Sequence, residues 1–267
     1  MTPVIDLLDD LPVNLPILAD GECLYSWCAL YHRLSGNAVA MRSNAQLFGS
    51  GGRRVRHDFP THLANFCART RNMLGTPESL AMERTMLGYY APFTSLSTYR
   101  RALGVITDGK SGDTKHVLGL MASRVGASHP LKACPACVER DLNELGYSRW
   151  MLEHQWPSVW VCRHHGNPLQ SLTKQSQPRD LREWTLPEDH AIGEWSDALI
   201  LPASSSERLM QIALVSVCIN HISVLFDHDR LRLAYRIGAK RRGWVAFDGT
   251  LRLAAMTRAR FWLSEGS

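Results

Sequence analysis

The sequence predicts a mainly α-helical protein with one small, metal-binding, β-containing layer near its centre. Apolar residues recur at the three- and four-residue spacing of helices through most of the chain. Between Cys134 and His165 this pattern gives way to paired cysteines, histidines and aromatic residues. With 45% hydrophobic and 21% charged residues among 267, the chain has enough apolar material for a packed core without disulfides.

Residues 1–130 are expected to form a helical region. After a proline-containing lead-in, "GECLYSWCALYHRLSG" has apolar groups at helical spacing, and Gly36 is placed to end that helix. A short second helix is expected over "RSNAQLFG". Thr76 followed by Pro77 marks the start of another helix, because threonine caps helices and proline is favoured in their first turn.

A basic loop and a further helix are expected between these elements. The loop is glycine-rich and carries Arg53, Arg54 and Arg56, which are expected to be mostly solvated. Asp58 follows the loop and is placed to cap a helix that runs to about Arg69.

Residues 131–170 are expected to form a zinc-binding module. Cys134 and Cys137 are separated by two residues, and Cys162 and His165 repeat that gap after 24 intervening residues. Zinc prefers these ligand types, and two close pairs can complete a tetrahedron. Four protein ligands leave no open position for water, so the metal would be structural. The alternative is a chance grouping of four unrelated residues.

The stretch between the two ligand pairs predicts the rest of this module. A short helix is expected over "VERDLNELG", and β-structure over "YSRWMLEHQWPSVWVC". His164 would leave a gap of one residue after Cys162 and is expected to point away from the metal. Three tryptophans are expected to pack this layer: Trp150, Trp156 and Trp160. The four other cysteines lie on apolar helix faces and are expected to be buried free thiols: Cys23, Cys28, Cys67 and Cys218.

Three stretches of the chain resemble the TniQ family, which includes the TnsD-type proteins. They are "DGECLYSWCALYHRLSG", "GYYAPF" and "CPACVERDLNELGYSRWMLEHQWPSVWVCRHHGNPL", within about residues 16–170. The residues that match the family's zinc ligands are Cys134, Cys137, Cys162 and His165. Many relatives carry another Cys-x2-Cys pair after the last ligand, but "QSLTKQSQPRDL" has no cysteine, so one zinc ion is expected.

The resemblance implies an adaptor in DNA transposition that is not an enzyme. Proteins of this family connect a target-recognition element to the AAA+ ATPase that regulates the transposase. The recognition element is either their own DNA-binding region or an RNA-guided CRISPR effector, as in CRISPR-associated transposons. A second copy of the chain, giving a homodimer, is another partner to consider.

The chain is expected to be cytoplasmic. No apolar run approaches the roughly 18 residues of a membrane span, and acids stand where a signal peptide would have bases. The cysteines lack the framework of a small secreted protein and are expected to be reduced.

The C-terminal part predicts more helices and a basic surface. Residues 171–202 are polar and contain proline, so they are expected to be a linker before a helical region over 203–267. Ser204 and Glu207 form a capping-box pattern before a long apolar stretch, which predicts a buried helix. From Asp229 to Arg260 the chain has nine basic and two acidic residues, a net charge of +7, against +5 for the whole chain.

Nucleic acid is the expected ligand of this basic segment, in which two short helices around a turn resemble a helix-turn-helix. The candidate phosphate contacts are Arg236, Lys240, Arg241, Arg242, Arg252, Arg258 and Arg260. A solvated helical face, or a face that docks on an acidic protein, is the alternative.

Two other functions compete with the adaptor. A stand-alone zinc-containing DNA-binding regulator would use the same basic residues. A P-loop NTPase would use "GVITDGKS", which matches G-x4-G-K-S with Lys110 as its phosphate-binding lysine. Such a loop follows a buried strand and opens an apolar helix, whereas "STYRRAL" precedes this one and Gly112 and Asp113 follow it, so an exposed loop lysine is favoured.

Overall fold

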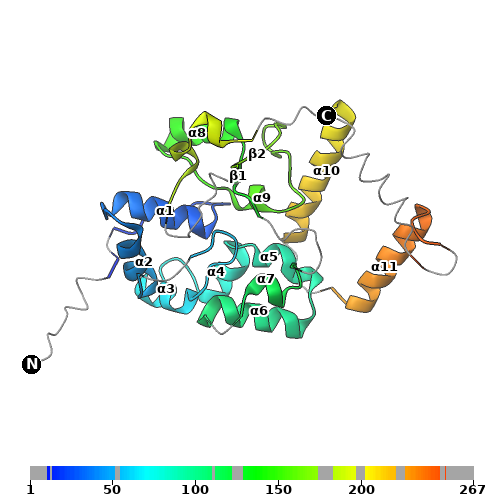
Figure 1. Cartoon of the computed structure of the whole chain (residues 1–267), viewed down its shortest axis with the longest axis horizontal. Coiled ribbons are helices and arrows are strands. Elements are labelled where there is room, and N and C mark those ends of the chain that lie inside the picture. Colours follow the sequence, from blue (N-terminus) through cyan, green and yellow to red (C-terminus); the bar gives the residue numbers. More distant parts are fainter. Residues whose placement is uncertain are drawn as a thin grey trace, which may run out of the picture.

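The computed structural model describes residues 11–12, 14–51, 55–109, 112–121, 129–173, 183–196, 202–220, 226–246 and 250. The described elements form two stacked layers, with two further helices at one side (Figure 1). The first layer, here the helical layer, contains α1 (Leu24–Leu34), α2 (Ala40–Phe48), α3 (Leu63–Arg69), α4 (Pro77–Glu83), α5 (Leu87–Tyr90), η1 (Ala91–Phe93), α6 (Leu96–Asp108) and α7 (Thr114–Val117). The second, here the metal layer, contains β1 (Lys132–Ala133), α8 (Pro135–Leu145), α9 (Leu152–Gln155) and β2 (Gln170–Ser171). The predicted mainly helical fold with a small β-containing layer is confirmed.

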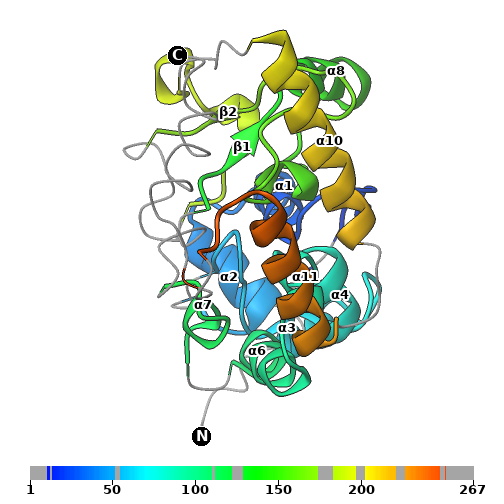
Figure 2. The same cartoon turned by 90° about the vertical axis from the view of Figure 1, so that its right-hand side faces the viewer.

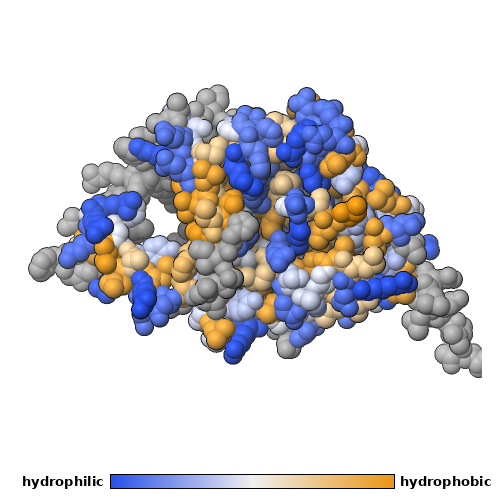
Figure 3. Space-filling view, turned by 180° about the vertical axis from the view of Figure 1, so that it is seen from behind, coloured by the Kyte–Doolittle hydropathy of each residue, from blue (hydrophilic) through white to orange (hydrophobic). Residues whose placement is uncertain are grey.

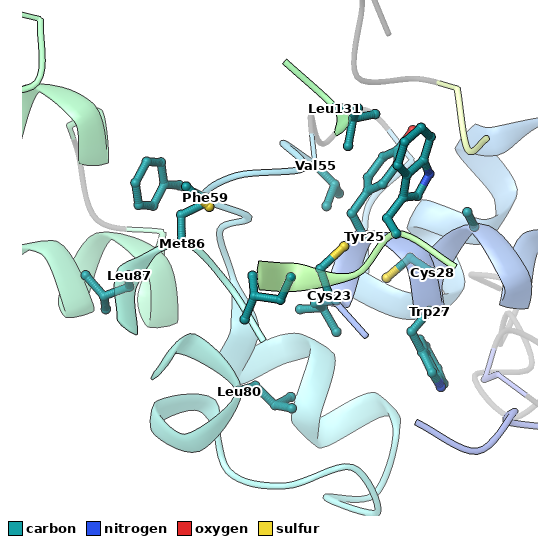
Figure 4. Packing of buried hydrophobic residues seen from close by; sticks show 14 of the residues in the cluster. Cys23, Tyr25, Trp27, Cys28, Val55, Phe59, Leu80, Met86, Leu87 and Leu131 are labelled. Atoms are coloured by element: carbon teal, nitrogen blue, oxygen red, sulfur yellow. The ribbon is translucent and has the colours of Figure 1, made fainter. Parts of the chain in front are cut away.

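Helix α1 lies at the centre of the apolar core and is buried along most of its length. Trp27 is fully buried, with its ring stacked 5.9 Å from that of Tyr31 and edge-on to Phe66 at 5.5 Å. Figure 4 shows Tyr25 and Trp27 leaving α1 on opposite sides. Because neighbouring elements cover this helix on all sides, apolar residues are needed all round it.

Local signals in the sequence place several helix ends correctly. The Thr76 side chain accepts a hydrogen bond of 3.1 Å from the Ser79 amide, so α4 begins where the Thr-Pro pair predicts. Helix α1 ends at Leu34, and Gly36 follows in the left-handed conformation with φ of +65°.

The predicted cap at Asp58 is wrong. Helix α3 begins only at Leu63, and the Asp58 carboxylate is buried instead. It lies 2.6 Å from Lys115 Nζ and 2.9 Å from His129 Nδ1. Two partners that are distant in the sequence therefore take the carboxylate, because a buried charge must be paired.

The described part of the phosphate-loop pattern is helical. Gly104 and the next four residues belong to α6, which ends at Asp108 and is followed by Gly109 in the left-handed conformation. Lys110 and Ser111 lie outside the described residues. A helix precedes this glycine where a phosphate loop requires a strand, which disfavours nucleotide binding.

The metal layer is built on very short elements. Strands β1 and β2 pair antiparallel, with Lys132 opposite Ser171 and Ala133 opposite Gln170. The predicted helix between the ligand pairs is present as α8. The stretch expected to be β-structure contains α9 instead, and its extended residues form only isolated bridges, one of them from Val161 to Pro168.

Residues 183–196, within the segment expected to be a linker, pack on the two layers. The segment contains η2 (Pro187–Asp189) and η3 (Ile192–Glu194). Trp184 donates a 3.0 Å hydrogen bond from Nε1 to Asn44 Oδ1, and Tyr25 donates one of 3.0 Å to the Glu183 carbonyl. These contacts tie the segment to α1 and α2.

Helices α10 (Ala203–Asn220) and α11 (His228–Arg241) lie on one side of the molecule (Figure 2). The expectation that the α10 stretch is buried is only half correct. Ala213 and Ser216 face the body, whereas Leu214 and Val215 are 48% and 56% exposed. Cys218, expected to be buried, is exposed, while Cys23, Cys28 and Cys67 are buried as predicted. Among the described residues, no helix combines the length and apolarity needed to cross a bilayer.

Candidate metal centre and basic helix

The four predicted zinc ligands meet at one point of the metal layer. The ligand atoms of Cys134, Cys137, Cys162 and His165 all lie within 4.8 Å of one another. Cys137 Sγ is 3.6 Å from Cys162 Sγ and 3.3 Å from His165 Nδ1, and His165 Nδ1 is 3.6 Å from Cys134 Sγ. Zinc bonds of about 2.3 Å to sulfur and 2.0 Å to nitrogen give tetrahedral edges of about 3.5–3.8 Å. The donor set and its spacing therefore fit one tetrahedral zinc ion.

Two tight turns hold the ligands in place. Cys134 is the N-cap residue of α8, and Pro135 occupies the first turn of that helix. In the second turn, the Gly166 amide donates to the Cys162 carbonyl at 2.8 Å, and Gly166 has φ of +69°. A side chain at that glycine would strain the turn that presents His165.

The thiols of the site lie too close together to ionise independently. Hydrogen bonds from the Cys137 and Cys162 thiols hold the pKa of Cys134 well below its usual value, and the amides of Cys137 and Ala136 lower it further. The pKa of Cys137 is raised, because its thiol donates to Cys134 and burial opposes a second charge. A divalent cation would remove this conflict, since it binds the deprotonated form of each thiol.

Lys132, two residues before Cys134, is a buried lysine that sequence patterns did not single out. Its Nζ donates hydrogen bonds of 2.7 and 2.6 Å to the carbonyls of Trp156 and Val159 and lies 4.8 Å from the centre of the Trp160 ring. Burial lowers the pKa of this ammonium to about 7. The lysine thus joins β1 to the loop that leads to Cys162. The pattern of polar and apolar residues around Lys132 does not predict that this side chain is buried.

His164 points away from the ligand cluster. Its Nε2 lies 3.2 Å from Glu153 Oε1, and Arg163 Nε lies 2.6 Å from Glu153 Oε2. The predicted packing holds for Trp150 and Trp156, which are buried, whereas Trp160 is 39% exposed and lies over the Lys132 ammonium.

Helix α11 displays the described part of the basic segment. Arg232, Arg236 and Lys240 recur every fourth residue, so they form one stripe along the exposed side of the helix. Figure 3 shows hydrophilic and hydrophobic side chains next to each other on α11, which lies at the left of that view. Arg241 is also exposed, and Arg242 lies 5.6 Å from the Trp244 ring. The remaining candidates, Arg252, Arg258 and Arg260, lie outside the described residues. Most of the predicted second helix lies outside them too.

Comparison with known proteins gives a match to a family model and a similarity to a named protein. The TniQ family model matches residues 15–169. The chain is also 26% identical over 155 residues to a protein of Escherichia coli named "Transposon Tn7 transposition protein TnsD". That alignment covers 57% of this chain and 30% of the relative, so the chain spans less than a third of that protein.

The family match contains the four candidate metal ligands and the helices that surround α1. It covers more than half of the 267 residues and ends directly before β2. The chain therefore belongs to the TniQ family.

Proposed function

We propose that this chain selects the target of a DNA transposition system and acts as a non-catalytic adaptor within it. The TniQ match, which runs from residue 15 to residue 169 and includes all four candidate ligands, carries this proposal. The similarity to a protein named for transposition supports it. The proposed protein partner is an AAA+ ATPase that regulates the transposase.

Each of the four proposed units has its own role. The first two, residues 1–130 and 131–170, present surfaces to protein partners. Residues 171–202 connect these two units to residues 203–267, which contain the basic helix. We propose that the metal is zinc and that it supports the shape of the second unit, because four protein ligands fill a tetrahedral shell. The work of such a protein takes place in the cytoplasm, where its DNA and its partners are.

Target recognition is proposed to involve nucleic acid bound along α11. The stripe of Arg232, Arg236 and Lys240 is exposed, and no ion pair occupies it within the described part of the chain. Cations spaced along one side of a helix can contact successive phosphates. The nucleic acid is either target DNA or the guide RNA of a CRISPR effector, and Arg241, Arg242 and the basic residues after position 250 would add contacts.

A stand-alone DNA-binding regulator is the second candidate function, because the same exposed stripe favours it. An insertion assay separates the two. Cells that carry a donor element, its transposase and its AAA+ ATPase should give targeted insertions only when this chain is supplied. The adaptor proposal fails if the purified chain binds a specific duplex alone and recovers neither the ATPase nor an effector complex in pull-downs.

A matched pair of variants tests the role of α11 in the same assay. Arg236→Glu with Lys240→Glu should abolish targeted insertion and reduce the salt dependence of nucleic-acid binding, since that dependence scales with the number of phosphates that the protein neutralises. Arg100→Glu with Arg101→Glu makes the same charge change on the exposed side of α6 and should leave insertion unchanged. Equal losses in the two pairs would show that charge alone, and not α11, matters.

A further inference from the structure

An apolar groove lies on the metal layer, next to α8. Val138 and Leu142, one helical turn apart, line one wall, and Pro187, Ile192 and Trp195 line the other. The hollow has a volume of about 470 Å³, within the usual range of binding sites. Ile192 is 95% exposed and Leu142 39% exposed, so the apolar surface continues beyond the hollow onto its rim.

The two walls of this groove are held independently of any occupant. On the first wall, the Asp141 carboxylate accepts hydrogen bonds from Arg149 at 2.9 and 3.0 Å, which anchors the inner side of α8. On the second, Arg33 binds Glu188 at 2.5 Å and Asp189 at 2.7 Å, and the Trp150 indole donates to the Thr185 carbonyl at 2.8 Å. A site that is formed in advance requires little ordering when a partner binds.

The charges at the groove select the chemistry of its occupant. The described residues that line it include two carboxylates and no lysine or arginine. Glu188 is already paired with Arg33, whereas Glu139 is exposed at the mouth of the groove with no ion pair among the described residues. An occupant with apolar side chains and a cation close to them would satisfy the walls and Glu139 together.

The shape favours a helix over a small molecule. Val138 and Leu142 lie one turn apart along α8, and Leu142 and Ile192 carry the apolar surface from the hollow onto its exposed rim. Amphipathic helices bind such grooves through apolar residues spaced three and four apart. We infer that this groove binds an amphipathic helix of a partner protein, with lysine or arginine beside its apolar side. The inference rests on the adaptor role and assigns it a docking surface.

A synthetic peptide tests the groove without any knowledge of the natural partner. The probe is a fluorescent helical peptide with leucines on one side and lysines on the other, and its control has glutamates in place of the lysines. The zinc-loaded full chain should bind the lysine peptide at least about tenfold more tightly than the glutamate peptide, measured by anisotropy. Hydrogen exchange should slow in residues 135–145 and 187–195 when the peptide is bound.

Two matched variants locate the binding. Glu139→Lys should weaken binding of the lysine peptide about tenfold, while Glu144→Lys, the same change at an exposed residue of α8 that does not line the groove, should not. Leu142→Glu should abolish binding with unchanged zinc content and circular dichroism, since this side chain is already partly exposed.

Four results would overturn the inference. The first three are absence of binding, equal binding by Glu139→Lys and Glu144→Lys, and protection confined to another part of the chain. The fourth is self-association of the full chain that Leu142→Glu abolishes, because a second copy would then occupy the groove. The peptide assay involves no transposition partner, so its failure and the failure of the adaptor proposal remain distinguishable.

Discussion

The helical layer and the metal layer differ in what stabilises them. The helical layer surrounds α1 with apolar and aromatic side chains, and Trp27, Tyr31, Phe48 and Phe66 are all buried there. The metal layer has two-residue strands, the 11-residue α8 and the four-residue α9, and its buried apolar side chains, among them Leu131, Trp150 and Trp156, belong to the same cluster as those around α1. Its described interior includes the buried polar side chains of Lys132, Glu153, His154 and Gln155. The comparison teaches that both layers share apolar packing, and that the ligand cluster gives the second layer a metal-dependent contribution that the described part of the first layer does not have.

Backbone hydrogen bonds join the two layers, with donors in both of them. The Cys23 amide donates to the Trp150 carbonyl at 3.0 Å, and the Leu152 amide donates to the Gly21 carbonyl at 2.7 Å. Asp58 of the helical layer holds His129, which directly precedes the metal layer. Variants in each layer and at this junction can therefore separate the contributions.

Loss of the metal should have the largest effect and should be confined to one layer. Cys162→Ser removes one of four ligands, and the apparent binding energy of a structural zinc is on the order of 10 kcal/mol. We expect one zinc per chain by elemental analysis in the wild type, none in the variant, and fast hydrogen exchange only in residues 129–173. Cys218→Ser changes an exposed cysteine and should keep the zinc. No zinc in the wild type would refute the metal centre.

Trp27→Ala should destabilise the helical layer by about 4 kcal/mol, because it removes a fully buried indole and leaves a cavity. It also removes the 2.9 Å hydrogen bond from the indole to the Pro16 carbonyl. Thermal and urea unfolding measure the loss, and zinc content should stay at the wild-type level. Met41→Ala, on the exposed side of α2, should cost less than about 0.5 kcal/mol. Loss of zinc from Trp27→Ala would show that the layers fold as one unit.

Asp58→Asn should weaken the junction by about 3 kcal/mol at neutral pH, because it removes the anion that lies beside the buried Lys115 ammonium. Burial alone would raise the pKa of Asp58, but the hydrogen bond from His129 and the charges of His57, Lys115 and His129 hold it well below its usual value. A carboxyl with a lowered pKa contributes stability that is full above about pH 4 and is lost as the pH falls further.

The variant should therefore show a flatter dependence of its free energy of unfolding on pH below about 4 than the wild type does. Glu144→Gln, at an exposed position of α8, should retain the wild-type profile. Parallel profiles for Asp58→Asn and the wild type would mean that Asp58 is not the group that titrates.

His164→Ala should have the smallest effect. It removes only a partly exposed contact to Glu153, so we expect less than about 0.5 kcal/mol and an unchanged zinc content. His165→Ala is the matched comparison and should weaken zinc binding strongly, as competition with a chelator would measure. An equal loss in the two variants would contradict the choice of ligand.

Much of the fold and of the metal site could be predicted because short-range patterns determine them. The start of α4 at Thr76–Pro77 and the Cys-x2-Cys and Cys-x2-His pairs depend on residues within one turn of each other. Asp58 had an equally good local pattern, but partners 57 and 71 residues away decided its place. Lys132 was missed for the same reason, since carbonyls 24 and 27 residues later bind its ammonium.

The exposure of α10 could not be predicted from its composition. Its apolar residues surround the whole helix, and periodicity then gives no sign of which side is covered. Only the position of Ala213 and Ser216 against the body decides that Leu214 and Val215 face outwards. Of the basic candidates, Arg236, Lys240 and Arg241 lie on α11, and their ligand stays a prediction.

The segment 183–196 has a consequence for how this protein can be divided. The family match ends at residue 169, yet Trp184 reaches Asn44 and the Glu183 carbonyl receives the hydroxyl of Tyr25, 158 residues earlier. A fragment cut at the end of the matched region would leave a flank of α1 open to water and to proteases. During synthesis, this side of α1 stays uncovered until residues 183–196 have left the ribosome. The packed body of this protein therefore extends beyond the residues that the family model matches.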